Sequence, residues 1–212
     1  MKKKRFLFVG SLLIILFIIW TVLVQVVDVQ CMGMNGTSVG FASMNKWFHS
    51  LTGVHMNLYV ITDWLGLVPL FACLVFGVVG LVQLIKRRSL FKVDYDILIL
   101  GVYYVLVILG YLIFEMITIN YRPILINGVM EVSYPSSTTL LVLSVMPTVL
   151  EQVNRRVKSN VVRMIIRIMA VGFSLFMVVG RLISGVHWFS DIVGGVLLSL
   201  GLYYLYKGIV LD

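Results

Sequence analysis

The residues that could do chemistry gather near the end of the chain, in GRLISGVHWFSDIVGG, residues 180–195. His187 and Asp191 are four residues apart, so a helix that starts at Val186 would put both on one face. There the carboxylate could orient the imidazole, as a nucleophilic histidine requires. Arg181 could reach back and hold an oxyanion with both prongs of its guanidinium. The alternative is a membrane-edge cluster, in which the histidine anchors the chain at the interface and the aspartate only caps a helix.

The composition excludes an ordinary soluble protein. Of the 212 residues, 60% are hydrophobic and 12% are charged, and the mean hydropathy is +1.04. These values are typical of an integral membrane protein, here of a single domain. The net charge of +8 does not indicate a nucleic-acid partner, because the basic residues flank apolar runs. The two cysteines, Cys31 and Cys73, are not expected to pair or to bind metal.

Apolar runs predict an all-α fold, an integral membrane bundle of six transmembrane helices. The predicted spans cover residues 6–27, 65–85, 97–114, 136–150, 168–180 and 192–206. A long connection follows the first span, and within it NKWFHSL predicts an amphipathic segment that lies in the membrane interface. Its histidine, His49, and His55 further on are expected to be interfacial rather than catalytic. We therefore divide the chain into residues 1–57, the first span with its outer segment, and a core of residues 58–212.

The distribution of charge predicts the orientation. With six spans and a cytoplasmic N-terminus, the cytoplasmic segments contain 14 of the 17 Lys and Arg residues. This bias supports a multi-pass protein with both termini in the cytoplasm. The three basic residues on the outer side are Lys46, Arg122 and Arg181. An arginine at membrane depth is costly, so the two arginines are candidates for function.

With these residues in place, the chain resembles the type 2 phosphatidic acid phosphatase family. The resemblance spans roughly residues 58 to 206 and rests on three motifs in order: Arg122-Pro123, then Pro135-Ser136, then the third motif of Arg181, His187 and Asp191. The third motif and the spacing of all three are the specific part. The resemblance implies a membrane lipid phosphatase that acts without metal or cofactor.

The resemblance also implies a role for each matching residue. His187 would be the nucleophile that forms a phosphohistidine, with Asp191 orienting it. Arg122 and Arg181 would bind the phosphoryl oxygens, together with the turn of Ser136, Ser137 and Thr138. Two guanidiniums and a turn of amides suit phosphoryl transfer, which depends on positioning and charge neutralisation.

The sequence departs from the family pattern at three places in the first two motifs. The lysine that begins the first motif is replaced by Glu115. In the second motif, Ser137 replaces glycine, and Thr138 replaces the histidine that acts as general acid. Threonine cannot donate a proton at neutral pH. Partial burial at the membrane edge could raise the pKa of Glu115 enough for it to replace the acid, whereas a nearby Arg122 would lower it.

Three functions are compatible with these departures. The first is a phosphatase for a phosphate or pyrophosphate lipid, either an isoprenyl pyrophosphate, whose leaving phosphate needs little protonation, or a phosphatidate-like lipid. The second is a catalytically impaired homologue that binds or senses lipid phosphates. The third is a transport or partner-interaction role, which no internal repeat supports. The phosphatase is favoured because the nucleophile, Asp191 and both arginines are retained. We expect the site to face outward from a bacterial plasma membrane, with a lipid phosphate and membrane lipids as partners; the sequence predicts no oligomeric state.

Overall fold

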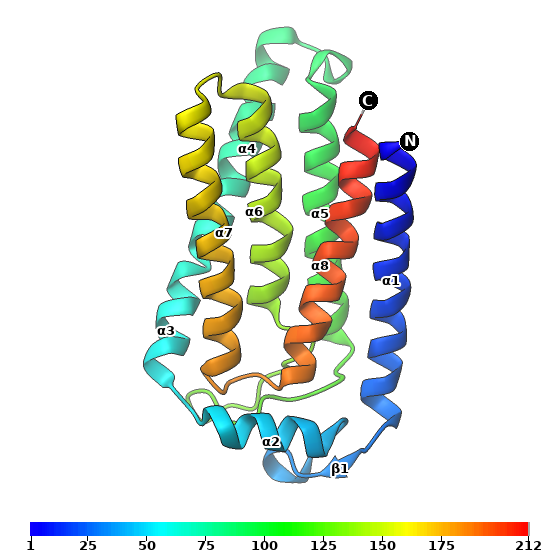
Figure 1. Ribbon diagram of the computed structural model, residues 1–212, viewed down its shortest axis with the longest axis vertical. Helices are drawn as coiled ribbons and strands as arrows, with labels where there is room; N and C mark the ends of the chain where they lie inside the picture. The colour runs from blue at the N-terminus through cyan, green and yellow to red at the C-terminus, as the bar shows by residue number, and fades with distance from the viewer. Residues whose placement is uncertain (212) are drawn as a thin grey trace.

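The computed structural model describes residues 1–211, and these residues form a bundle of long helices (Figure 1). The eight α-helices are α1 (Lys2–Val26), α2 (Ala42–Thr52), α3 (Met56–Leu65), α4 (Leu67–Arg87), α5 (Tyr95–Met116), α6 (Ser137–Arg156), α7 (Asn160–Ile183) and α8 (Phe189–Val210). Two short strands, β1 (Gln30–Cys31) and β2 (Ser38–Val39), pair antiparallel after α1. Two 3-10 turns complete the elements, η1 (Met34–Gly36) and η2 (Leu90–Lys92).

The prediction of a helical membrane protein is confirmed, but the count of six spans is not. Among residues 1–211, five helical segments are long and apolar enough to cross a membrane: α1, α3 joined to α4, α5, α7 and α8. The predicted span of residues 136–150 is the one left out, and it lies in α6, which is 20 residues long and contains Pro147. This helix is much less apolar than its neighbours because its buried face carries hydroxyl and amide side chains, among them Thr138, Thr139, Ser144, Thr148 and Gln152.

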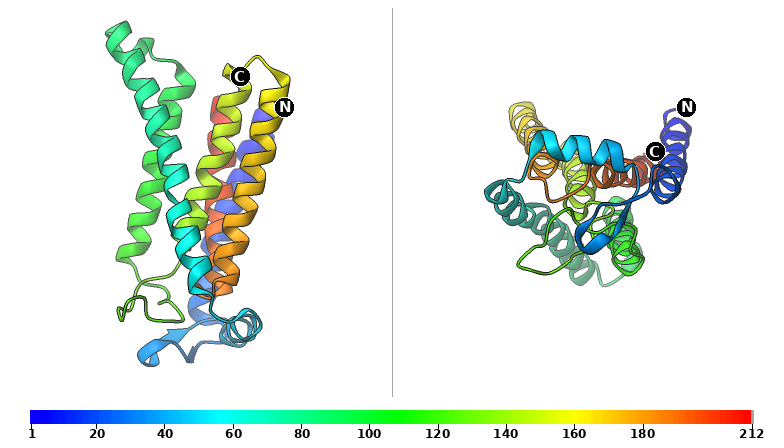
Figure 2. Two further views of the ribbon diagram at one scale, coloured as in Figure 1. Left: turned by 90° about the vertical axis from the view of Figure 1, so that its left-hand side faces the viewer. Right: turned by 90° about the horizontal axis from the view of Figure 1, so that it is seen from below.

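The long helices lie side by side and α2 crosses one end of them (Figures 1 and 2). α1 packs along α8, α6 packs against both α7 and α8, and α3 packs against α7. The contact of α1 with α8 is close at Gly201, where an added Cβ would lie 2.7 Å from Ile14. The predicted amphipathic segment is confirmed as a helix, since it forms α2, whose Trp47 and Leu51 are exposed.

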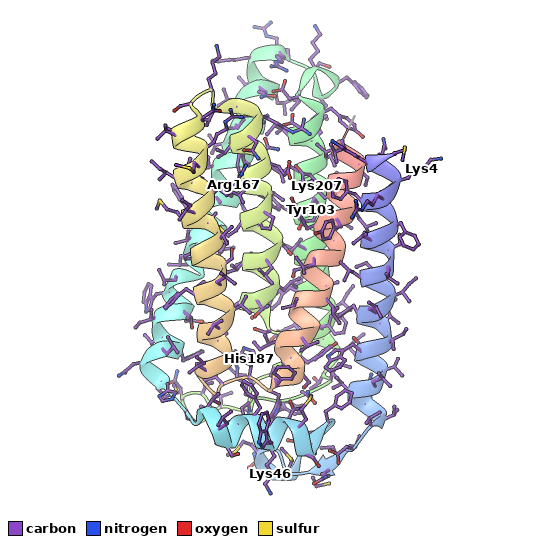
Figure 3. All side chains as sticks on the ribbon, viewed as in Figure 1. Lys4, Lys46, Tyr103, Arg167, His187 and Lys207 are labelled. Atoms are coloured by element: carbon purple, nitrogen blue, oxygen red, sulfur yellow. The ribbon has the colours of Figure 1, made fainter. Side chains whose placement is uncertain are left out.

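The two ends of the bundle differ in charge. Both termini lie at one end, together with the α4–α5 and α6–α7 connections (Figure 1). Lys4, Arg167 and Lys207 are found toward that end, whereas Lys46 and His187 lie toward the other (Figure 3). The 14 basic residues predicted to be cytoplasmic therefore belong to one end of the molecule, and the candidate site belongs to the opposite end.

A hairpin-like loop between α5 and α6 covers part of the site end. Its backbone pairs Arg122 with Glu131, and Ser133 with Asn120. The turn at its tip is Asn127-Gly128, with positive φ values of 50° and 78°. Both residue types adopt such angles readily, and Asn-Gly is a common two-residue hairpin turn. The hairpin thus brings residues from the first and second motifs to the same place.

Candidate active site

His187 lies in the turn between α7 and α8, not on a helix. The predicted helix from Val186 is wrong, because α8 begins at Phe189. The backbone N–H of Trp188 donates to the Oδ2 atom of Asp191 over 3.0 Å, and this cap fixes the helix start. The preceding turn needs glycine, since Gly185 has φ of 70° and an added Cβ would lie 2.0 Å from the carbonyl oxygen of Gly53.

The surroundings of the His187 ring fix its tautomer. Nδ1 lies 3.1 Å from the carbonyl oxygen of Ser133, and Nε2 lies 3.2 Å from Nη1 of Arg122. A carbonyl can only accept, so the hydrogen belongs on Nδ1 and the lone pair on Nε2. The pKa of His187 is lowered to about 4, chiefly by burial and also by the positive charge of Arg122, while Asp191 opposes both. His187 is therefore neutral at neutral pH, with Nε2 directed at an arginine.

Asp191 combines the two roles that the sequence left as alternatives. Its carboxylate is fully buried and lies 3.7 Å from Nδ1 of His187, too far for a short hydrogen bond. Oδ2 accepts from the backbone of Trp188, and Oδ1 accepts from Nδ2 of Asn120 over 3.0 Å. The aspartate thus caps α8 and also places a negative charge beside the ring, whereas the carbonyl of Ser133 is the nearer partner of Nδ1.

Arg181 is almost fully buried near the end of α7, and most of its donors are already used. Nε and Nη2 both donate to Oγ1 of Thr138, over 2.9 and 2.7 Å, and Nη2 also donates to Asp63 over 2.7 Å. The guanidinium lies over the ring of Tyr59, 4.8 Å from its centre. Only Nη1 is buried without a partner. The two-pronged clamp stays a prediction, and in this structure Arg181 has one nitrogen, Nη1, without a partner.

Arg122 reaches the site from the hairpin and is held less firmly. Its Nη1 contacts Nε2 of His187 and lies 3.5 Å from the carbonyl oxygen of Val186. Its Nε is 2.9 Å from Oε2 of Glu131, yet this ion pair lacks the alignment of a hydrogen bond. Its guanidinium lies 5.7 Å from the centre of the Tyr59 ring. Tyr59 therefore contacts both arginines of the predicted phosphate site.

The start of α6 brings the second motif to the same place, although with different contacts from those predicted. The hydroxyl of Ser136 caps α6 by accepting from the N–H of Thr139, and the N–H of Ser136 donates to the carbonyl oxygen of Asp191. Thr138 holds Arg181 through its hydroxyl. The N–H groups of Ser137 and Thr138 belong to the first turn of α6, where a helix offers no internal acceptor. These two amides, rather than Ser136, are placed to bind an anion.

Glu115 lies near the end of α5 and is exposed. It lines a small cavity together with His187, so the structure brings it to the site. The expected neighbour of Glu115, Arg122, instead forms its ion pair with Glu131. The partial burial expected for Glu115 is not found.

Sequence reasoning missed several residues of the site: Tyr59, Asp63, Asn120, Glu131 and Ser133. Asp63 gave a signal, because it is an acidic residue directly before an apolar run, where a charge is expensive. The hairpin also gave one, since Asn127-Gly128 lies between apolar residues in ILINGVM. Tyr59 and Ser133 gave none, because their roles depend on tertiary contacts.

The helix α2 supports the His187 turn from outside the bundle. Oδ1 of Asn45, which is fully buried, accepts from the backbone of Ser190, and Nε2 of His49 lies 3.1 Å from the carbonyl oxygen of Gly185. The ring of His49 also lies beside that of Trp188. His49 is thus part of the scaffold behind the site, and the expectation of a purely interfacial residue is too simple.

The charged groups of the site are suited to an anion. Within residues 1–211, no three His, Cys, Asp or Glu side chains come close enough together to hold a metal ion. The free Nη1 of Arg181, the guanidinium of Arg122 and the first amides of α6 supply positive charge around Nε2 of His187. Such a set of donors can hold a phosphoryl group and neutralise its oxygens.

Comparison with known proteins agrees with this geometry. A search of solved structures finds a transmembrane PAP2-type phosphatidylglycerolphosphate phosphatase from Bacillus subtilis, with a TM-score of 0.65 and 17% identity over 94% of both chains. No curated protein sequence matches the chain. The model of the PAP2 superfamily matches residues 70–211, more than half of the chain. The resemblance read from the motifs is thereby confirmed, and the chain belongs to the PAP2 superfamily.

Proposed function

We propose that the protein is a membrane lipid phosphatase that works through a phosphohistidine on His187. The observation that carries this proposal is the contact of the unprotonated Nε2 with Nη1 of Arg122, over 3.2 Å. A phosphoryl group bound by Arg122, Arg181 and the amides of Ser137 and Thr138 would lie within reach of that lone pair. The substrate is a lipid with a terminal phosphate or pyrophosphate, such as an isoprenyl pyrophosphate or a phosphatidate-like lipid.

In the first half of the reaction, Nε2 attacks phosphorus and the bond from phosphorus to the lipid oxygen breaks. Nδ1 keeps its hydrogen, which stays hydrogen-bonded to the carbonyl oxygen of Ser133. The phosphorylated ring therefore becomes positively charged. The buried carboxylate of Asp191, 3.7 Å away, stabilises that charge. The arginines neutralise the three equatorial oxygens as the bond order to phosphorus changes.

The leaving oxygen is the weak point of the mechanism. Thr138 occupies the position of the family's acid and uses its hydroxyl to hold Arg181. Glu115 lines the cavity beside His187 and is the acid that we assign to this step. A phosphate leaving from a pyrophosphate needs little protonation because its pKa is about 6. Pyrophosphate lipids are therefore the better substrates, while the solved relative is a phosphatidylglycerolphosphate phosphatase and makes that lipid worth testing.

The same proposal includes an orientation. We take α6 as a sixth crossing, so that the even number of crossings agrees with both termini at one end of the bundle (Figure 1). The basic residues at that end favour the cytoplasm, and His187 then faces outward from the plasma membrane, which we take to be bacterial. The boundary between residues 1–57 and 58–212 stays a prediction, and the packing of α1 along α8 favours one unit.

A second candidate is a lipid-phosphate-binding or regulatory homologue with impaired chemistry. The observation in its favour is that Thr138 has no acidic proton and that Glu115 is exposed rather than buried. Such a protein would bind the lipid through the same arginines and leave the phosphate in place.

The test is phosphate release by the purified protein in detergent, from an isoprenyl pyrophosphate, phosphatidylglycerolphosphate and phosphatidic acid. His187→Ala should abolish release, whereas His55→Ala should not, because the ring of His55 hydrogen-bonds to the carbonyl oxygen of Thr52 and its contact with Ser184 is made by the backbone. No release from any of the three lipids, with binding that is lost in Arg122→Ala, would establish the binding protein instead.

A further inference from the structure

A small cavity next to His187 is the right size for one water molecule. Its volume is about 20 Å³, and its lining includes His187, Ser133 and Glu115. The remaining walls come from the end of α5, the turn before α6 and the first residues of α6. A water needs roughly 10–15 Å³ of such space and several polar partners.

Ser133 offers one of these partners. The residue is buried, and its hydroxyl has no hydrogen-bond partner, although its backbone is fully used. The N–H of Ser133 donates to the carbonyl oxygen of Asn120, and its own carbonyl oxygen accepts from Nδ1 of His187. Leaving a buried hydroxyl unpaired costs about 1–3 kcal/mol, and Ser133 is one of the residues around a cavity large enough for a water that could pair it.

The proposed phosphohistidine must be hydrolysed by a water, and the usual residue for this task is missing. A base has to take a proton from that water. The hydroxyl of Thr138 is bound to Nε and Nη2 of Arg181 and has no basic lone pair to offer. Glu115 is the carboxylate that shares the cavity with His187 and Ser133.

We propose that this cavity holds the hydrolytic water of the second half of the reaction, bound by the hydroxyl of Ser133 and deprotonated by Glu115. The inference rests on the proposed function. The water oxygen attacks phosphorus, and the bond between phosphorus and Nε2 of His187 breaks. The electron pair returns to Nε2, the proton passes to the carboxylate of Glu115, and inorganic phosphate leaves. His187 regains its neutral form with hydrogen on Nδ1, and Glu115 is protonated again, so that it can donate to the leaving oxygen of the next lipid.

The test separates the two halves of the reaction in Ser133→Ala. Full-length protein in detergent is mixed with an isoprenyl pyrophosphate labelled with ³²P at its terminal phosphate, and it is quenched in alkali, which preserves phosphohistidine. The variant should keep the first-turnover burst, because the carbonyl that holds His187 belongs to the backbone. Its steady-state turnover should fall about tenfold, the worth of one lost hydrogen bond, and the labelled fraction of the enzyme should rise in step.

Ser144→Ala is the matched control. The hydroxyl of Ser144 is also buried and unpaired, but it lies on α6 and lines none of the cavity around His187. This variant should behave as the wild type. A labelled fraction that does not rise in Ser133→Ala, or a lost burst, would overturn the assignment of the water. Absence of any label from the wild type would instead overturn the phosphohistidine, and with it the proposed function.

Discussion

The two arginines of the site are held in opposite ways. Arg181 comes from a long helix, and three of its contacts, to Thr138 twice and to Asp63 once, are 2.9 Å or shorter. Arg122 comes from a hairpin, and its partners are a histidine nitrogen, a carbonyl oxygen at 3.5 Å and a misaligned carboxylate. Arg181 therefore has one rotamer fixed by the protein, whereas Arg122 has a choice of partners.

This difference fits the separate tasks of the two residues. A fixed guanidinium with one free nitrogen, Nη1, defines where a phosphoryl oxygen must lie. Arg122 instead contacts Nε2 of His187, the atom that attacks phosphorus in the proposed reaction, and in that reaction Arg122 gives up this contact when substrate binds. The ion pair between Arg122 and Glu131 is weak, so moving Arg122 costs little free energy. In the proposed reaction, one arginine therefore positions the phosphate and the other responds to it.

The largest effect is expected for Arg181→Lys. Lysine keeps the charge but loses the planar fork that binds Thr138 and Asp63 and lies over Tyr59. The free nitrogen would no longer be held in position, so kcat/KM should fall about 1000-fold, which is roughly 4 kcal/mol. Steady-state phosphate release measures this change. A loss below tenfold would mean that charge alone suffices at this position.

A smaller effect is expected for Arg122→Lys, about 30-fold in kcat/KM. Lysine can still reach a phosphoryl oxygen as a point charge, and the contacts that it loses are weak ones. The measurement is the same assay, run beside Arg181→Lys in the same detergent. If Arg122→Lys were the more damaging of the two, the distinction between a fixed and a responsive arginine would be wrong.

Thr138→Val should have an effect of about tenfold. The change is nearly isosteric and removes the acceptor of two hydrogen bonds from Arg181, so the KM for the lipid should rise more than kcat falls. Thr138→His is a second test of the contact between Thr138 and Arg181. It restores the residue type of the related phosphatases, yet it displaces the partner of Arg181, and we expect no gain in rate. Faster hydrolysis by this variant would show that the position is still open to a general acid.

Much of the fold and the core of the site could be predicted from the sequence. The length of the apolar runs predicted the long helices, and the third motif identified Arg181, His187 and Asp191. Both signals are local in the sequence. The start of α8 was misplaced by three residues because Asp191 caps the helix as well as accompanying His187. The four-residue spacing of His187 and Asp191 does not tell whether Asp191 caps a helix or orients the histidine, and so it does not tell where the helix begins.

The contacts that set each arginine's behaviour could not be predicted, because they join segments far apart in the chain. Asp63 and Arg181 are 118 residues apart, and Ser133 and His187 are 54 apart. In the sequence, the replacement of the family's general acid by Thr138 indicated only the loss of a proton donor. The structure shows that the hydroxyl has a new partner, which only a view of α6 beside α7 could reveal.

The smallest effect is expected on the pKa of His187, and it distinguishes the two arginines by distance. This pKa is lowered from 6.5 to about 4, chiefly by burial, and the charge of Arg122 contributes more to the decrease than that of Arg181. Between these pH values the unfolded chain binds the proton and the folded chain does not, so stability from this group rises with pH. Arg122→Gln should raise the pKa of His187, and Arg181→Gln should raise it less. NMR titration of ¹⁵N-labelled histidine, with His187→Ala to assign the signal, measures both. Equal shifts in the two variants would mean that Arg122 is not the nearer charge in solution, and the contact with Nε2 would then be absent there.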